Sequence, residues 1–146
     1  MREILFKAKR IDNGEWTEGY YECDPDLDIH YICGFNYYSS ENGLEREFFN
    51  DEVNKETICQ YTGLTDKNGV KIWENDVVKY EDAEADFEGY HDNVFVNVGK
   101  TCITPQGVFF TNRQTVDMDD LWLSECSVDA EVIGNIFDNP ELLEGR

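Results

Sequence analysis

The sequence lacks any long apolar run. Residues 1–10 carry charges throughout and contain no apolar stretch of the kind that forms the centre of a signal peptide. No later segment approaches the roughly 18 uninterrupted apolar residues of a membrane-spanning helix. These absences predict that the chain is neither exported nor inserted in a membrane, and we expect it in the cytoplasm.

Basic residues are scarce as well. The chain has 12 Lys and Arg against 32 Asp and Glu, which gives a formal net charge of −20. A surface this negative repels phosphate backbones and anionic lipid head groups, so direct binding to nucleic acid or to a membrane is disfavoured. The same charge favours solubility, cations or a basic partner protein.

The cysteines show no pattern of a metal site or a disulfide framework. Their number is odd, their spacing is wide and no Cys-x-x-Cys pair occurs. We expect most of them to be small buried hydrophobic residues in β-rich surroundings. They are Cys23, Cys33, Cys59, Cys102 and Cys126.

What the chain does contain is material for a folded β domain. Its residues are 40% hydrophobic and 14% aromatic, too much for a disordered chain, and its length suits one domain spanning residues 1–146. Apolar and polar residues alternate over 3–10 and again over 15–22, on either side of Asn13-Gly14. This pattern predicts a β-hairpin.

Short strands separated by turns continue along the chain. Residues 50–56 and the acid-rich 81–92 are predicted as loops, the latter exposed, and 117–126 fits either a helix or an irregular strand. Asn139 is expected to cap one helical turn over 140–144, with Pro140 in its first position. The architecture predicted is mainly β, a small barrel or meander with little helix. The further strands are expected at 29–38, 58–61, around Val70 and Ile72, and at 77–80, 93–98, 108–111 and 130–137.

Three blocks of sequence together resemble the YopX family, small proteins carried by bacteriophages and prophages. The blocks are REILFKA at 2–8 with Trp16, YTGLTDKNG at 61–69 with Ile72 and 74–78, and EVIGNIFDNPELL at 131–143. The resemblance implies a mainly β fold with an SH3-like barrel portion, and a location inside the bacterial host cell. It implies no catalytic residue, because the family has no established biochemical function. One departure is Asn75, where the family pattern has Gly, and Asn tolerates the left-handed backbone of such a turn.

Asp66-Lys-Asn-Gly69 begins like a calcium-binding loop. An EF-hand loop needs Gly at its sixth position and a bidentate Glu at its twelfth, whereas here Gly is fourth and Val77 is twelfth. Asn-Gly is also the preferred pair of a two-residue hairpin turn. The segment is therefore predicted to be a turn.

Asp24, Asp26, Asp28 and His30 alternate along the chain. In an extended segment all would point to one side, where a hard cation could bind among three carboxylates. The alternative is a solvated loop that leads into a strand, and the sequence does not decide whether these acids, or those of 81–92, bind a cation.

A catalytic reading of the acidic segment is weak. His91 and Asp92 could form a dyad with Ser124 or Cys126 as nucleophile, but neither carries a nucleophile signature. The sequence therefore assigns no catalytic, cofactor-binding or metal-ligating residue and names no cofactor.

The aromatic residues could stack bases or sugars, but base-stacking proteins also need a basic groove. The basic residues near the N-terminus are spread along a single predicted strand and form no groove. Packing in the core and between strands therefore explains the aromatic residues better than stacking on bases does. In a strand, one member of each consecutive pair must face outward and leaves aromatic surface for a partner. The aromatics are Trp16, Trp73, Trp122 and the pairs Tyr20-Tyr21 and Tyr37-Tyr38, and the basic residues are Arg2, Lys7, Lys9 and Arg10.

These observations favour a non-enzymatic accessory protein of phage origin that binds a protein of the host or of the phage. One alternative is an acidic mimic of DNA that inhibits a nucleic-acid-binding protein. Another is a hydrolase or nucleotide-processing enzyme that uses a carboxylate-bound metal. Self-assembly into a homo-oligomer through strand edges is compatible with each of the first two hypotheses.

Overall fold

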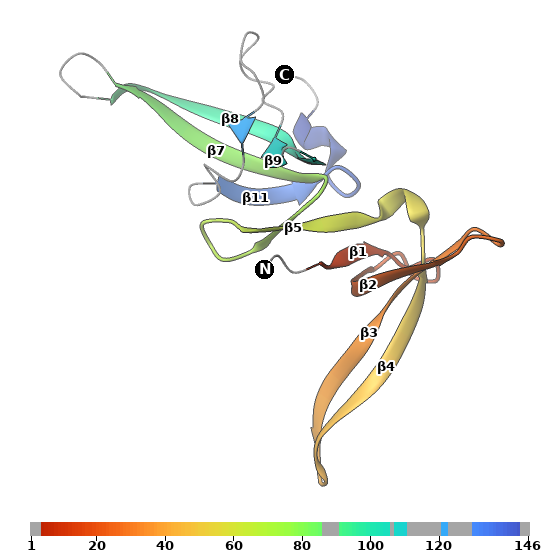
Figure 1. The fold of residues 1–146 in the computed structure, drawn as a ribbon. Helices are drawn as coiled ribbons and strands as arrows, with labels where there is room; N and C mark the ends of the chain where they lie inside the picture. Colours follow the sequence, from red (N-terminus) through yellow and green to blue (C-terminus); the bar gives the residue numbers. More distant parts are fainter. Residues whose placement is uncertain (1–3, 86–90, 106, 111–120, 123–129, 144–146) are drawn as a thin grey trace. The chain divides into compact units, whose positions relative to one another are not determined.

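The computed structural model describes residues 4–85, 91–105, 107–110, 121–122 and 130–143. The chain divides into two compact units, residues 1–61 and 62–146. Antiparallel strands dominate both units, and helix in the described part is confined to short 3-10 segments, so the predicted mainly β fold is confirmed (Figure 1). The described strands form open sheets without a closed barrel, in contrast to the barrel portion that the resemblance implied.

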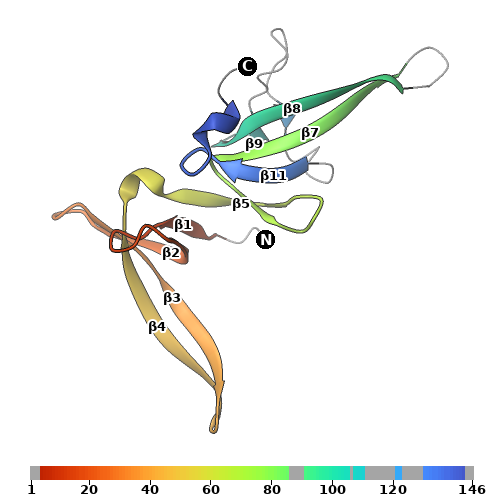
Figure 2. The ribbon, with the colours of Figure 1, turned by 180° about the vertical axis from the view of Figure 1, so that it is seen from behind.

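The first unit is built on a meander of hairpins. Its strands follow the order β4–β3–β2–β1–β5 across the sheet, and neighbouring strands in this order are antiparallel. The views from opposite sides both show β3 and β4 running side by side over their whole length (Figures 1 and 2). The elements are β1 (Phe6–Lys9), β2 (Trp16–Asp24), β3 (Ile29–Ser40), β4 (Gly43–Val53), η1 (Lys55–Thr57) and β5 (Cys59–Thr65), the last of which crosses the boundary between the units.

Glycines shape the turns of this unit. Gly14 has a φ of 73° in the predicted β1–β2 turn, and Gly43 has a φ of 102° in the β3–β4 turn. Gly19 acts differently, because a Cβ at this position would lie 2.3 Å from the carbonyl oxygen of Cys33. At Gly19 strand β2 changes partner, pairing with β1 before it and with β3 after it.

The core of the first unit is small. Ala8, Ile32 and Val53 are buried, and Phe6, Phe49 and Ile58 pack against them. An isolated bridge between Arg10 and Val53 joins the end of β1 to the end of β4. Burial is therefore concentrated where β1, β3 and β4 meet.

The prediction of a loop over 50–56 is wrong for its first half, because residues 50–53 belong to β4 and pair with 30–33 of β3. Residues 50–52 are polar, and the backbone hydrogen bonds to β3 hold them as a strand that ends at the buried Val53. Residues 55–57 form η1, whose first turn is capped by the Asn54 side chain accepting from the Glu56 N–H at 3.0 Å.

The second unit has its own sheet, with the strand order β10–β9–β8–β7–β11. Ile72, Val78, Val108 and Ala130 form its buried core. Its elements are β6 (Lys71–Trp73), which pairs with the end of β5, and β7 (Asp76–Ala85), β8 (His91–Thr104), β9 (Gly107–Phe110), β10 (Leu121–Trp122), β11 (Ala130–Asn135) and η3 (Pro140–Leu143).

The loop predicted over 81–92 is corrected where the structure describes it. Strand β7 continues to Ala85 and β8 begins at His91, and the ladder between them runs from the pair Val77 and Lys100 to the pair Ala85 and His91. Residues 86–90 lie outside the described part. Of the ambiguous segment 117–126, the structure describes only the two-residue strand β10.

The final helical turn is confirmed as η3, with Pro140 in its first position. Asn139 directly precedes this turn, but its side chain does not accept a hydrogen bond from a described backbone N–H of the turn. Its Oδ1 accepts instead from the Asn135 N–H at 3.3 Å, while the Asn139 carbonyl accepts from Leu142 at 3.1 Å. Asn75 has a φ of 70°, which confirms that it adopts the left-handed turn conformation.

Candidate functional site

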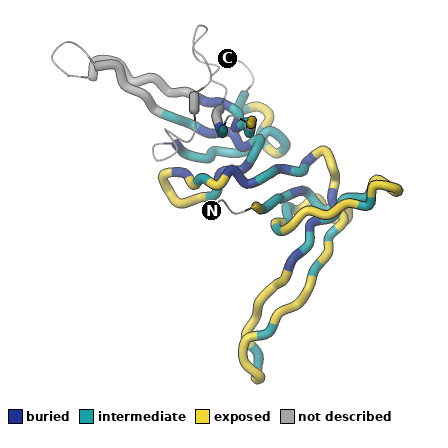
Figure 3. The backbone as a smooth tube through the Cα atoms, in the orientation of Figure 1, coloured by how far each residue is buried: buried dark blue, intermediate teal, exposed yellow. Residues whose placement is uncertain are grey.

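Beyond the core of the first unit, β3 and β4 extend as a two-stranded ribbon. Strand β2 pairs with β3 only as far as Cys33, whereas β3 and β4 remain paired up to Ser40 and Gly43. We call residues 34–40 and 43–49 the β3–β4 arm. Most of the arm is exposed, in contrast to the buried residues near Ile32 and Val53 (Figure 3).

One face of the arm is apolar. Residues directly opposite each other in an antiparallel pair point to the same side, and the pairs Phe35 with Phe48, Tyr37 with Arg46, and Ser39 with Leu44 alternate with the pairs of the other face. The exposed fractions are 43% for Phe35, 64% for Tyr37, 75% for Leu44 and 58% for Phe48. An isolated ribbon cannot bury both of its faces, so this row of large side chains remains open to solvent.

Contacts within the row hold its side chains in place. The rings of Phe35 and Phe48 meet edge to face with centroids 5.6 Å apart. The Arg46 guanidinium lies 4.3 Å from the centroid of Phe35, a cation–π contact. A shallow hollow of about 530 Å³ is lined by residues of both faces, namely Tyr37, Leu44 and Arg46 of this face and Tyr38 and Glu45 of the other.

The opposite face of the arm carries two carboxylates and one exposed aromatic residue, Tyr38. It carries Asn36 opposite Glu47 and Tyr38 opposite Glu45. The arm is therefore amphipathic, with an aromatic row on one side and carboxylates on the other. A contiguous row of exposed large apolar side chains marks an interaction site in soluble proteins.

The sequence predicted part of this surface. One member of the pair Tyr37-Tyr38 was expected to face outward; Tyr37 lies in the row, and Tyr38 is also exposed, on the opposite face. Leu44, Arg46 and Phe48 were not predicted, because no strand was expected between residues 39 and 49. Phe35 lies in the strand predicted over 29–38, but its exposure was not expected. The signal that could have found the second strand is Asn42-Gly43, the same hairpin pair that marks the β1–β2 turn.

The other predicted aromatics have mixed environments. Tyr20 and Tyr21 are exposed by 61% and 37%, whereas Trp73 is buried. Trp16 is half-buried, and the Lys7 ammonium lies 4.6 Å from the centroid of its ring. Trp122 lies in β10, and its side chain is outside the described part.

The structure does not bring Asp24, Asp26 and Asp28 together with His30 as a cation site. Asp24 closes the β2–β3 turn, since its Oδ1 accepts from the N–H groups of Asp26 at 3.0 Å and Leu27 at 3.2 Å. Asp28 has a φ of 52°, which breaks the extended geometry that would align the acids. Within the residues the structure describes, no three His, Cys, Asp or Glu side chains gather as metal ligands.

Asp28 instead joins a surface network. Its carboxylate accepts hydrogen bonds from Lys55 Nζ at 2.7 Å and from His30 Nε2 at 2.8 Å. His30 Nδ1 is hydrogen-bonded to the hydroxyl of Tyr21. The hydrogen bond from Lys55, followed by that from His30, lowers the pKa of Asp28. Burial, followed by Cys23 and the charge of Asp28, raises the pKa of Tyr21.

Asp66 is a structural residue, as the turn prediction for 66–69 requires. Its Oδ1 accepts from the N–H groups of Asn68 and Val70, each at 2.9 Å, and its Oδ2 accepts from the Val132 N–H at 2.9 Å. Burial acts to raise its pKa, but these hydrogen bonds and Lys67 outweigh burial and lower it. Asp66 thereby ties the turn to β11.

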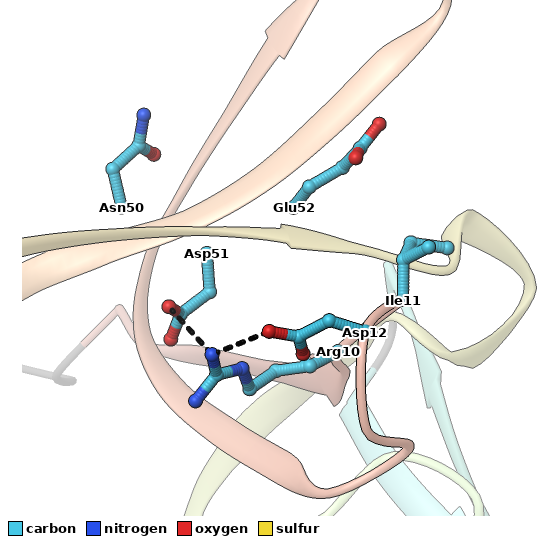
Figure 4. A pocket seen from close by; sticks show the side chains of 6 residues that line it. All are labelled: Arg10, Ile11, Asp12, Asn50, Asp51 and Glu52. Carbon is cyan, nitrogen blue, oxygen red and sulfur yellow. Dashed lines mark hydrogen bonds and ion pairs between the residues drawn. The ribbon is translucent and has the colours of Figure 1, made fainter.

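A second hollow, of about 220 Å³, lies where β1 meets β4 and is lined by polar residues and Ile11 (Figure 4). Arg10 Nη2 lies 2.8 Å from Asp12 Oδ2 and 3.9 Å from Asp51 Oδ1. The two carboxylates neutralise the guanidinium, so this hollow is not a free anion site. Its ion pairs connect the end of β1 to β4.

The remaining candidates fall partly outside the described part. Ser124 and Cys126 lie outside the described residues, as do the side chains of His91 and Asp92. The proposed dyad and its nucleophile therefore lie outside the part of the chain that the structure describes. The prediction of buried cysteines holds for Cys59, whereas Cys33 and Cys102 are intermediate and Cys23 is exposed. Burial, then the charge of Glu22, raises the pKa of Cys33.

Comparisons with known proteins give a matching family model and a similar solved structure. The family model described as YopX protein matches residues 6–144. A crystal structure of protein EF1440 from Enterococcus faecalis is similar, with 26% sequence identity, 99% of this chain and 100% of that chain covered, and a TM-score of 0.58. No curated protein matches the chain. Among the described helices, none has the length and apolar character needed to cross a membrane.

Proposed function

From the premise that this chain belongs to the YopX family, we propose that it is a non-enzymatic accessory protein, of phage or prophage origin, that binds another protein through the β3–β4 arm. The observation that carries the proposal is the exposed row formed by Phe35, Tyr37, Leu44 and Phe48 on one face of the arm. Because these side chains are exposed, they contribute little to the stability of the fold, and their apolar area is available for an interface.

The composition of the row matches the centre of a protein interface. Aromatic residues and Arg are enriched in such centres and carry much of the binding energy, whereas the surrounding rim is polar. Arg46 lies over Phe35, and the acidic residues Glu45 and Glu47 border the row from the opposite face. A partner that covers the row therefore meets an aromatic centre and an acidic rim.

Affinity capture tests this proposal. The tagged wild-type chain, a Leu44→Ser/Phe48→Ser variant and a Leu27→Ser variant would be exposed to bacterial lysate at low and moderate salt, and bound proteins quantified by mass spectrometry. Leu27 is the matched control, because it is 68% exposed but lies in the β2–β3 turn, away from the arm. We expect a reproducible partner that the wild type and Leu27→Ser retain and the arm variant loses. Equal capture by all three chains would contradict the proposal.

A further inference from the structure

Strand β4 is an edge strand with a free outer side. It stands first in the strand order of its sheet, so in the described part no strand pairs with its outer side between Leu44 and Asn50. Such an edge offers unpaired N–H and C=O groups to an added strand.

The register shows which residues present these groups. Ser40 and Gly43 pair across a two-residue turn, so the odd-numbered residues of β4 direct their backbone groups to β3 and the even-numbered residues direct theirs outward. The Glu52 carbonyl confirms this parity, because it accepts from the Ile11 N–H at 3.0 Å on the side opposite β3. Leu44, Arg46 and Phe48 thus present the free backbone groups of the arm.

The side chains beside this edge alternate in chemistry. Leu44 and Phe48 flank it on the apolar face, while Glu45 and Glu47 flank it on the opposite face. The Arg46 guanidinium lies over Phe35 of β3 and so leans away from the outer edge. An incoming strand therefore meets carboxylates on one face and apolar side chains on the other.

We propose that the outer edge of β4 binds an extended, basic segment of the partner protein as an added antiparallel or parallel strand. This inference rests on the proposed function and specifies its partner. Residues that lie opposite each other across a strand pair share a face, so Lys or Arg of the segment faces Glu45 and Glu47 and its alternate apolar residues face Leu44 and Phe48. The segment has the pattern basic–apolar–basic–apolar, and the net charge of −20 draws it to the surface.

A second copy of this chain fits the edge poorly. In an antiparallel pairing centred on Phe48, Glu45 of each copy would stand opposite Asp51 of the other, and in one centred on Glu47 the two Glu47 carboxylates would meet. Like charges directly opposite each other destabilise a strand pair. Charge complementarity therefore selects a cationic segment over self-pairing.

The peptide acetyl-KVKIKVK-amide is the probe that tests the edge, with acetyl-EVEIEVE-amide and acetyl-KPKPKPK-amide as controls. Isothermal titration at low salt is expected to show binding of the first peptide only, because the second has the wrong charge and the third lacks N–H donors at alternate positions. Hydrogen exchange of the Leu44, Arg46 and Phe48 amides is expected to slow on binding. Equal binding of the Pro-containing peptide would reduce the effect to charge alone and overturn the proposal.

Matched variants of the chain locate the site. Glu45→Gln/Glu47→Gln is expected to weaken binding of the basic peptide about three- to tenfold, whereas Glu22→Gln/Asp26→Asn, with the same change of charge, should have a smaller effect. Equal weakening by both pairs, or dimerisation of the wild type through this edge in analytical ultracentrifugation, would overturn the inference. If the peptide fails to bind while Leu44→Ser/Phe48→Ser still abolishes partner capture, the proposed function stands and only the edge inference falls.

Discussion

At the scale of the residue, Gly19 is a position where a single methyl group conflicts with the fold. Its absent side chain leaves room for the Cys33 carbonyl, which a Cβ would approach to 2.3 Å, and that neighbour is backbone. A contact this short forces strands β2 and β3 apart at the point where β2 changes partner.

Gly19→Ala is therefore expected to lower the free energy of unfolding by about 1–3 kcal/mol or more, the range of overpacked sites. Gly14→Ala is the control, since nothing lies within 4 Å of a Cβ there and only its φ of 73° opposes the change. Urea unfolding measures both, and an equal or larger loss for Gly14→Ala would contradict the close packing at Gly19.

Asp66 predicts a pH dependence of stability. Because its folded pKa is lowered, the carboxylate contributes stability that is complete above its unfolded pKa near 4 and is lost as the pH falls through the folded value. Asp66→Asn places an amide donor against an N–H group and is expected to cost about 1–3 kcal/mol. It should also flatten the decline of stability below about pH 4.

Thermal unfolding of the wild type, Asp66→Asn and Asp26→Asn between about pH 2 and pH 7 checks this expectation. The exposed Asp26 serves as the control for a simple change of charge. If the stability of Asp66→Asn falls as steeply at low pH as that of the wild type, the hydrogen bonds of Asp66 do not couple its titration to folding.

At the scale of the element, the arm separates binding from folding. Ile32 is fully buried in the core of the first unit, whereas Leu44 and Phe48 are exposed by 75% and 58%. We expect Leu44→Ser/Phe48→Ser to change the free energy of unfolding by no more than about 1 kcal/mol. Ile32→Ala, in contrast, should cost about 2–5 kcal/mol. Urea unfolding of the chain, followed by fluorescence, measures the free energy of unfolding of both variants. A large loss of this free energy for Leu44→Ser/Phe48→Ser would mean that the row of side chains contributes to packing in the folded state.

The same element shows the limits of sequence reasoning. The β1–β2 hairpin was predictable, because alternation on both sides of Asn13-Gly14 matches a strand that buries one face. Strand β4 was not predicted, because between Leu44 and Phe48 both of its faces are largely exposed, so the sequence there has no simple apolar–polar alternation. The extensions of β7 and β8 were missed for a related reason, since acids and small residues are held there by backbone pairing.

The candidate site was predicted only in outline. Consecutive tyrosines require exposed aromatic area in any strand, so Tyr37-Tyr38 indicated a surface. Which neighbours join them depends on the register between β3 and β4, which places Phe48 opposite Phe35. That register follows from the two-residue turn between Ser40 and Gly43. The alternation at Asp24–Asp28 left a cation site and a solvated loop open, and the structure has a turn there.

At the scale of the whole molecule, the net charge of −20 opposes folding by repulsion among carboxylates. Salt screens this repulsion, with a Debye length near 10 Å at 0.1 M. We expect the melting temperature to rise as NaCl increases from about 10 mM to about 0.5 M, as measured by differential scanning fluorimetry. A falling melting temperature would show that ion pairs such as Lys55 with Asp28 outweigh the repulsion.

Site-specific photocrosslinking in the bacterial cell tests most directly whether the arm is the binding element. A photoreactive amino acid would replace Leu44 in one chain and Leu27 in another, two positions of similar exposure in the same unit. We expect a discrete crosslinked adduct with another protein from position 44 and none from position 27. An adduct from position 27 alone, or the same adducts from both positions, would contradict binding through the β3–β4 arm.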